Sequence, residues 1–560
     1  MSRLRRRVRA VGPSACLAVA AVLAACGDSA LPIPFVPTPA PTPEQPREVT
    51  ITAVDRASGT PVAGAQLEVD GQAAQTDARG AATLTALRGA SVRASAVGFD
   101  AARGRVPEDG DLVIELRSNV LRGTVTDVDG RPLARVRVFV EGDETLVRTD
   151  EHGRYELAGV PEQGTVIYKL PGHRLGAIPL DAQMTKDVAL PRFEVRALYA
   201  PAAIFEAPGR LEAMLELIER TEANALVIDV KETDGQLYHA TDLPQAVEAG
   251  AVRERPLFRL EELLPMLRER GIYTIARMVV MKDNTLGSAR PDLAVMNTAT
   301  GEPWRDNIGG IWLDPAAPGV ADYAAAIAAD LAARGFDEVQ LDYIRFFSDG
   351  PYDVADTNLP NLQSFRLPAL RHVLRVIADE LETSRAFLAA DVFPIPFIVP
   401  DDQGIGQRAD SVMPYLDYVC PMSYPSHYGP GVFGFDVPNE HPYEVVSQTL
   451  AIMGQQAAGL PLVLRPWIQD FGYGQFRAYG PADVRAEMQA AADAGAGGWM
   501  IWNPGGQFTE AALGPPRPDE AAALVSEALP AAVPEPAASQ SAATAGPPSP
   551  SVSAAPPAAP

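Results

Sequence analysis

Two aspartates interrupt apolar, strand-like segments of the sequence. In EVQLDYIRF (residues 338–346) apolar residues alternate with a second set that contains Asp342, and in FLAADVFP (residues 387–394) Asp391 lies on the less apolar face. A carboxylate buried without a partner is costly, so each aspartate must be paired or reached by solvent. Two carboxyl groups, one protonated and one ionised, can act as general acid and base. We therefore take Asp342 and Asp391 as the candidate catalytic residues.

Other polar side chains occur within or beside neighbouring apolar segments. Asp229 and Lys231 lie in ALVIDVKE, Arg277 in YTIARMVV and Arg465 in PLVLRPWIQDF. Such groups can support the two aspartates or substitute for one of them. Alternatively, they form a structural ion-pair network, with Arg277 and Arg465 holding two acids. The candidate supporting or substitute residues are Asp229, Lys231, Glu232, Arg277, Arg345, Gln469 and Asp470.

The segments that carry these residues alternate with Ala- and Leu-rich segments of helical period. We count eight strand-like segments, and helical segments follow most of them. This pattern predicts an α/β fold, a (β/α)8 TIM barrel over residues 192–529 with enlarged loops. A doubly wound sheet is the alternative, although no Gly-rich phosphate loop follows the first strand. Asp342 and Asp391 lie near the C-terminal ends of their strands, where barrel enzymes place their chemistry.

Aromatic residues gather in the same region. All five Trp residues lie in the predicted barrel, and four of them lie at or just past expected strand ends or in the long loop after the third strand. Aromatic rings stack on the apolar faces of sugars, although we expect about half of these Trp side chains to be core. The candidate sugar-stacking residues are Trp304, Tyr424, Trp467 and Trp499.

An internal repeat precedes the barrel. GTPVAGAQLEVDG is answered by GRPLARVRVFVEG, and TDARGAATL by TDEHGRYEL. Short alternating segments with Gly and Asp turns predict two small all-β sandwiches, at residues 48–118 and 119–191. Both resemble carboxypeptidase regulatory-like domains, which implies non-catalytic spacers or binding modules. The repeats contain no Trp, so no aromatic sugar platform is evident.

The two ends of the chain differ from the folded regions. Residues 1–25 have an Arg-rich start and an apolar run typical of a signal peptide, and LAAC resembles the bacterial lipobox, which implies that Cys26 carries a lipid anchor. An ordinary signal peptide is the alternative. Residues 26–47 form a Pro-rich linker, and residues 530–560 a Pro- and Ala-rich tail expected to be disordered. We expect a membrane-anchored lipoprotein of the cell envelope or cell surface.

Several functions are disfavoured by composition and missing motifs. The formal net charge of −24 opposes binding to nucleic acid. The six His residues are scattered singly, without HExxH or a Cys cluster, so we expect no metal. Neither a GxSxG elbow, a Walker loop nor a dinucleotide fingerprint occurs, so we expect no cofactor. No obligatory protein partner is evident.

Seven motifs carry a resemblance to a known family. They are ALVIDVKETDGQLYH, YTIARMVVMKDNTL, IWLDPAAPGVADY, FDEVQLDYIRFFSDG, ADVFP, PWIQDF and GWMIWNPGGQFT. In this order, over nearly all of residues 193–512, they resemble a bacterial family of TIM-barrel glycoside hydrolases whose activity is mostly assigned by relationship. The sequence departs from the family at Phe347 and Pro394, where Pro and Gly are more usual.

The resemblance implies hydrolysis of glycosidic bonds. It places Asp342 at the fourth strand as nucleophile or base and Asp391 at the fifth strand as proton donor. We expect an extracellular or cell-envelope polysaccharide as the substrate, bound without a metal. The alternatives are a non-catalytic glycan-binding or scaffold lipoprotein on the same fold, and a metal-dependent deacetylase.

Overall fold

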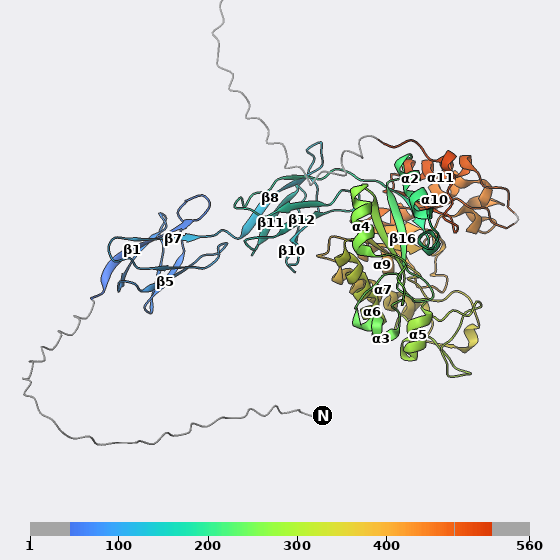
Figure 1. Ribbon diagram of the computed structural model, residues 1–560, viewed down its shortest axis with the longest axis horizontal. Helices are drawn as coiled ribbons and strands as arrows, with labels where there is room; N and C mark the ends of the chain where they lie inside the picture. Colours follow the sequence, from blue (N-terminus) through green and yellow to red (C-terminus); the bar gives the residue numbers. More distant parts are fainter. Residues whose placement is uncertain (1–44, 475, 518–560) are drawn as a thin grey trace, which may run out of the picture.

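The computed structural model describes residues 45–474 and 476–517, which form two small β-domains and a larger α/β domain. Figure 1 shows them in a row, with the first β-domain at one end and the second beside the α/β domain. The signal peptide, Cys26 and the tail at residues 530–560 lie outside the described residues. No helix among the described residues is long and apolar enough to cross a membrane.

The first β-domain is a sandwich of two sheets, with strand orders β4-β1-β7 and β3-β2-β5-β6. Buried and half-buried residues alternate along β1, as expected for a strand with one face in the core. Its strands are β1 (Arg47–Asp55), β2 (Gln66–Val69), β3 (Gln72–Gln75), β4 (Ala81–Ala86), β5 (Ser91–Ser95), β6 (Ala102–Arg105) and β7 (Leu112–Leu116).

The second β-domain repeats this architecture, with strand orders β11-β8-β14 and β10-β9-β12-β13. Its core is a separate cluster of Val, Leu and Tyr side chains. Its strands are β8 (Val120–Thr126), β9 (Arg137–Val140), β10 (Leu146–Arg148), β11 (Arg154–Ala158), β12 (Thr165–Lys169), β13 (Gly176–Pro179) and β14 (Val188–Ala189).

The α/β domain is built on one parallel sheet that closes on itself. Its strands are β15 (Val195–Ala200), β16 (Ala225–Lys231), β17 (Tyr273–Val279), β19 (Glu338–Asp342), β21 (Phe387–Val392), β22 (Tyr418–Pro421), β23 (Val463–Leu464), β24 (Trp467–Gln469) and β25 (Gly498–Trp502). β23 and β24 are two parts of one strand: β22 pairs with β23, Met422 bridges Trp467, and β24 pairs with β25. Within residues 195–502 the sheet is therefore an eight-stranded barrel, which confirms the predicted fold class.

Helices cover the outside of the barrel. The longer ones are α2 (Arg210–Glu219), α4 (Leu260–Glu269), α6 (Val320–Arg334), α7 (Gln363–Glu380), α10 (Pro442–Gln456) and α11 (Pro481–Asp493). Loops carry α1 (Ala202–Glu206), α3 (Pro244–Ala249), α5 (Asn284–Ala289), α8 (Ile395–Ile398), α9 (Ala409–Val412), β18 (Met296–Asn297) and β20 (Ala355–Asp356).

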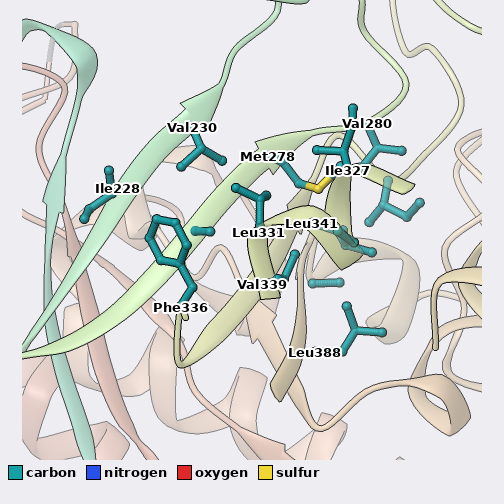
Figure 2. Close-up of a cluster of buried hydrophobic side chains, with 14 of the residues drawn as sticks. Ile228, Val230, Met278, Val280, Ile327, Leu331, Phe336, Val339, Leu341 and Leu388 are labelled. Atoms are coloured by element: carbon teal, nitrogen blue, oxygen red, sulfur yellow. The ribbon is translucent and has the colours of Figure 1, made fainter. Parts of the chain in front are cut away.

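Along each barrel strand, successive side chains point to opposite sides, and we call each alternating set a parity. The apolar parity faces these helices. Figure 2 shows side chains of β16, β17 and β19 gathered with two residues of α6. Burying each such side chain contributes about 1.5–3 kcal/mol, so the packing also fixes which residues face inward. The labelled side chains are Ile228, Val230, Met278, Val280, Ile327, Leu331, Phe336, Val339, Leu341 and Leu388.

The inward parity of β19 forms three levels inside the barrel. Glu338, at the start of the strand, makes a fully buried ion pair with Arg465. Above it, Gln340 Nε2 lies 3.3 Å from Met500 Sδ. Asp342 ends the strand at the mouth of the barrel. Glu338 is therefore a structural residue of the barrel floor, while Asp342 lies at the opposite end of the strand.

The strand predicted at residues 338–346 is shorter than expected. β19 ends at Asp342, and Tyr343 takes φ = 50°, a left-handed conformation that is uncommon outside Gly. Tyr343 consequently leaves the strand instead of continuing its helix-facing side, and its ring lies 5.8 Å from that of Trp312 at the mouth. Backbone conformations of this kind concentrate at functional sites.

The second sandwich docks on the floor of the barrel, where the strands begin. Arg137 binds Asp417, the residue before β22, through a short ion pair. The backbone N–H of Gly172 donates to the Tyr418 hydroxyl oxygen at 2.9 Å. Both barrel residues are buried, so the contact is part of the folded core.

Lys169 is the most deeply buried charged group at this contact. Its Nζ donates to the carbonyl oxygens of Ser384 (2.9 Å) and Ala386 and lies 3.9 Å from Asp417 Oδ2. Burial lowers the pKa of Lys169 to about 7. The second sandwich therefore supplies polar groups that the barrel floor needs, which a loose spacer would not do.

Candidate active site

A pocket of about 170 Å³ opens at the C-terminal mouth of the barrel. It contains both predicted catalytic aspartates together with two arginines and a wall of apolar and aromatic side chains. Its lining residues are Arg277, Asp342, Tyr343, Arg345, Asp391, Phe393, Met422, Tyr424, Trp467 and Trp502.

Arg277 of β17 organises the acids of this mouth. Its Nη2 lies 2.5 Å and its Nε 3.1 Å from Asp342 Oδ2 on the neighbouring strand β19. Its Nη1 donates to Asp229 Oδ1 at 2.5 Å and also to Glu232. Although burial opposes the charge, the three carboxylates hold the pKa of Arg277 above its usual range. Arg277 thus stays a cation that binds three acids.

Asp342 is arranged to act as a carboxylate. Oδ2 accepts hydrogen bonds from Nε and Nη2 of Arg277, and Oδ1 accepts one from the backbone N–H of Tyr343 at 2.6 Å. An ionised carboxyl group only accepts hydrogen bonds, which is what these donors require.

Asp391 has the opposite environment. Its side chain is 2% exposed, and its Oδ1 accepts the indole N–H of Trp467 at 2.6 Å. Burial raises the pKa of Asp391 well above its usual range, and the nearby charge of Asp342 raises it further, while Arg277 and Trp467 oppose the shift. Asp391 therefore holds a proton under conditions in which an exposed aspartate has lost it.

The remaining two acids of the mouth support Arg277. Asp229 accepts a short hydrogen bond from the Tyr199 hydroxyl, and burial raises its pKa to about 6 despite Arg277. Glu232 is more exposed, and Arg277 lowers its pKa in spite of partial burial. The structural ion-pair network that was the alternative interpretation of Asp229 thus coexists with the pocket instead of replacing it.

Several pocket residues were not among the candidates from the sequence. The ring of Trp502 stacks on that of Tyr199 with 4.0 Å between centroids, and Phe393 and Met422 complete the apolar wall. A usable signal existed for Trp502, because it shares the inward parity of β25 with Met500. Phe393 and Met422 lie just past strand ends, where parity no longer applies.

Three polar candidates belong neither to the pocket lining nor to the group of acids bound by Arg277. Lys231 makes a buried ion pair at 2.8 Å with Asp283, because a register shift after Asp229 interrupts the strand. Gln469 accepts the backbone N–H of a neighbouring loop, and Asp470 accepts two hydrogen bonds from Thr509. These side chains hold loops in place and contribute no group to the pocket.

Two of the four predicted sugar-stacking residues are core. Trp304 is 0% exposed, packs against Phe347 and donates its indole N–H to a backbone carbonyl. Trp499 faces the helices, on the parity of β25 opposite to the pocket. The structure contradicts a stacking role for both. Tyr424 and Trp467 do border the pocket, and Trp467 also binds Asp391.

An eight-stranded parallel barrel surrounded by helices defines a TIM-barrel protein, and the two carboxyl groups lie at its C-terminal mouth, where barrel enzymes place their chemistry. The family described as "Putative glycosyl hydrolase domain" matches residues 197–508, more than half of the chain. The chain therefore belongs to this glycosyl hydrolase-like family.

Solved structures similar to this chain include three bacterial proteins. A hypothetical protein from Ruminiclostridium thermocellum is 31% identical over 35% of this chain and 97% of its own, with a TM-score of 0.31. The PgaB (BpsB) glycoside hydrolase domain from Bordetella bronchiseptica is 15% identical (56% and 94% coverage, TM-score 0.40). An α-galactosidase from Thermus thermophilus is 16% identical (79% and 89% coverage, TM-score 0.35). No curated protein matches the sequence.

Proposed function

We propose that this protein hydrolyses glycosidic bonds by carboxylate catalysis, with Asp391 as general acid and Asp342 as the ionised partner. One observation carries the proposal: a single pocket holds Asp391, whose pKa is raised by burial, beside Asp342, whose side chain is bound by Arg277. Asp391 would donate its proton to the leaving-group oxygen. Arg277 would hold the Asp342 carboxylate in position as positive charge develops on the sugar ring.

The spacing of the two groups favours a retaining mechanism. Arg277 Nε lies 3.1 Å from Asp342 Oδ2 and 4.0 Å from Asp391 Oδ2. The two oxygens are therefore at most roughly 7 Å apart, the sum of those distances, which is below most of the range of about 6.5–9.5 Å used by inverting enzymes. In this proposal Asp342 attacks the anomeric carbon and forms a glycosyl ester, and a water activated by Asp391 then hydrolyses it.

The substrate and location form the second part of the proposal. An extracellular or cell-envelope polysaccharide agrees with a signal peptide and a lipid anchor on Cys26, both inferred from the sequence. The two sandwiches would hold the barrel away from the membrane. We expect the protein to remain in the membrane fraction until detergent releases it. Cys26→Ala should abolish this association with the membrane.

Catalysis is tested by two isosteric substitutions. Asp342→Asn and Asp391→Asn should each lower turnover of any glycan that the wild type cleaves by at least ~10²-fold. Asp470→Asn is the matched control, because Asp470 is a buried acid that lies outside the pocket. Full activity in either folded pocket variant would refute the assignment. Binding of oligosaccharide by the wild type without any cleavage would identify a glycan-binding protein instead.

A further inference from the structure

Two guanidinium groups border the mouth pocket, and they differ in how their charge is balanced. Arg277 binds the carboxylates of Asp229, Glu232 and Asp342. Arg345, which is 7% exposed, makes no ion pair with any residue in the described part of the chain. A buried cation without a counter-ion is unfavourable, so its retention at the pocket calls for an explanation.

Aromatic rings hold Arg345 in place. Its guanidinium carbon lies 4.8 Å from the ring centroid of Trp312, 5.1 Å from that of Tyr343 and 5.0 Å from that of Phe393. Cation–π contacts stabilise a guanidinium without cancelling its charge. Burial lowers the pKa of Arg345, and arginine remains charged at neutral pH even so. The pocket therefore contains a fixed positive charge.

One edge of this guanidinium is left for a ligand. Nη1 donates its two hydrogens to the Phe346 carbonyl oxygen and to Ser348 Oγ, each at 3.0 Å. Nε and Nη2 make no hydrogen bond to the described residues, and neither atom is sealed from solvent. The edge formed by Nε–H and Nη2–H is the one that pairs side-on with both oxygens of a carboxylate.

We propose that Arg345 binds the carboxylate of an acidic sugar, so that the substrate is a glycan containing uronic acid residues. This inference rests on the proposed function, because it places the uronate beside Asp342 and Asp391 in the same pocket. Arg345 follows Asp342 by three residues, so a short segment of backbone holds the proposed recognition group close to the proposed reaction centre.

The acids near Arg345 do not fill this role. Asp342 and Asp349 act on Arg345 only through space, without an ion pair, and Asp342 is already bound by Arg277. The negative net charge of the chain would repel a polyanion at long range. That repulsion is screened by salt, whereas the paired hydrogen bonds in the pocket are short-range.

The test is a binding measurement on the full chain carrying Asp391→Asn, which prevents turnover. The probes are tetrasaccharides of galacturonate, of glucuronate and of hyaluronan, each paired with its carboxyl-reduced, neutral counterpart, plus a sulfated neutral tetrasaccharide. Tryptophan fluorescence reports binding, since Trp467 and Trp502 line the pocket. We expect at least one uronate probe to bind ~10–100-fold more tightly than its reduced counterpart, the range of a charge-assisted hydrogen-bonded pair.

Substitution of Arg345 assigns this preference to its guanidinium. Arg345→Met should bring the ratio within about threefold of one, and Arg345→Lys, which keeps the charge but not the flat edge, should give an intermediate ratio. Should Arg345→Met fail to fold, the Lys variant alone decides. Equal affinity for acidic and reduced probes, a preference that persists in the variants, binding of the sulfated probe alone, or binding of no uronate probe would each overturn the inference.

The two proposals fail in different ways. Cleavage of neutral glycans by the wild type, lost in Asp391→Asn but unaffected by Arg345→Lys, keeps the glycosidase and removes the uronate site. An Arg345-dependent preference for uronates with no cleavage of any of them keeps the binding site and removes the glycosidase.

Discussion

The hydrogen bond from Trp467 to Asp391 gives the sharpest test of the proposed general acid. The indole N–H lies 2.6 Å from Asp391 Oδ1 in a fully buried setting, and it stabilises the ionised carboxyl group in preference to the protonated one. Trp467→Phe removes the donor but keeps an aromatic ring. The pKa of Asp391, already raised by burial, should therefore rise further.

The magnitude follows from the strength of such a bond. A hydrogen bond to a charged group contributes about 1.5–3 kcal/mol, and one pKa unit corresponds to about 1.36 kcal/mol, so we expect a rise of roughly one to two units. A general acid works while protonated, so activity is lost as pH rises through its pKa. The alkaline limb of the kcat/KM profile should accordingly move to higher pH by that amount.

Two measurements check this prediction. One is the pH profile of kcat/KM, and the other is the infrared carboxyl band of Asp391, obtained by subtracting the spectrum of Asp391→Asn, which needs no substrate. Trp499→Phe is the control, because Trp499 lies on the same sheet but faces the helices. An alkaline limb that stays in place or moves to lower pH in Trp467→Phe would refute the reasoning.

Three further predictions concern stability. Arg277→Met should lower the free energy of unfolding by about 3–5 kcal/mol at pH 7 because it leaves buried carboxylates unpaired. In urea unfolding this loss should shrink as the pH falls through the pKa of Glu232, which Arg277 holds below its usual range. Asp391→Asn should raise the free energy of unfolding by about 1–2 kcal/mol at pH 8, and this gain should vanish toward pH 4. The reason is that a carboxyl group whose pKa is higher in the folded than in the unfolded state lowers stability only at pH values above the unfolded pKa. An equal gain at both pH values would contradict the burial of an ionisable group. Removing residues 1–118 should leave the calorimetric Tm of the barrel unchanged, whereas removing residues 1–191 should lower it, since Asp417 then loses Arg137 and Lys169.

The fold was largely predictable because the barrel strands and helices carry regular apolar patterns. Parity alone placed Asp229, Arg277, Asp342 and Asp391 in the interior, and the structure brings all four together at the mouth. Parity fails where the backbone departs from a regular strand. The register shift after Asp229 separates Lys231 from the other polar side chains of the interior, and no residue type announces it.

The positions of loop residues could not be predicted from the sequence for a related reason. Trp304 lies in the long loop after β17, where no period says which side of the chain is buried. Tyr343 adopts a left-handed conformation although nothing in its residue type requires one. The pairing of Trp467 with Asp391 joins two strands that are not neighbours in the sequence, and only the closure of the barrel brings their ends within hydrogen-bonding distance.

The docking of the second sandwich on the barrel floor sets the direction in which the molecule works. Arg137 and Lys169 contact the end at which the barrel strands begin, so the mouth, at the other end of the strands, faces away from the second sandwich. In a protein tethered by its N-terminus, the pocket would point outward from the tether. The glycan substrate that we propose could then reach the mouth without meeting the tether.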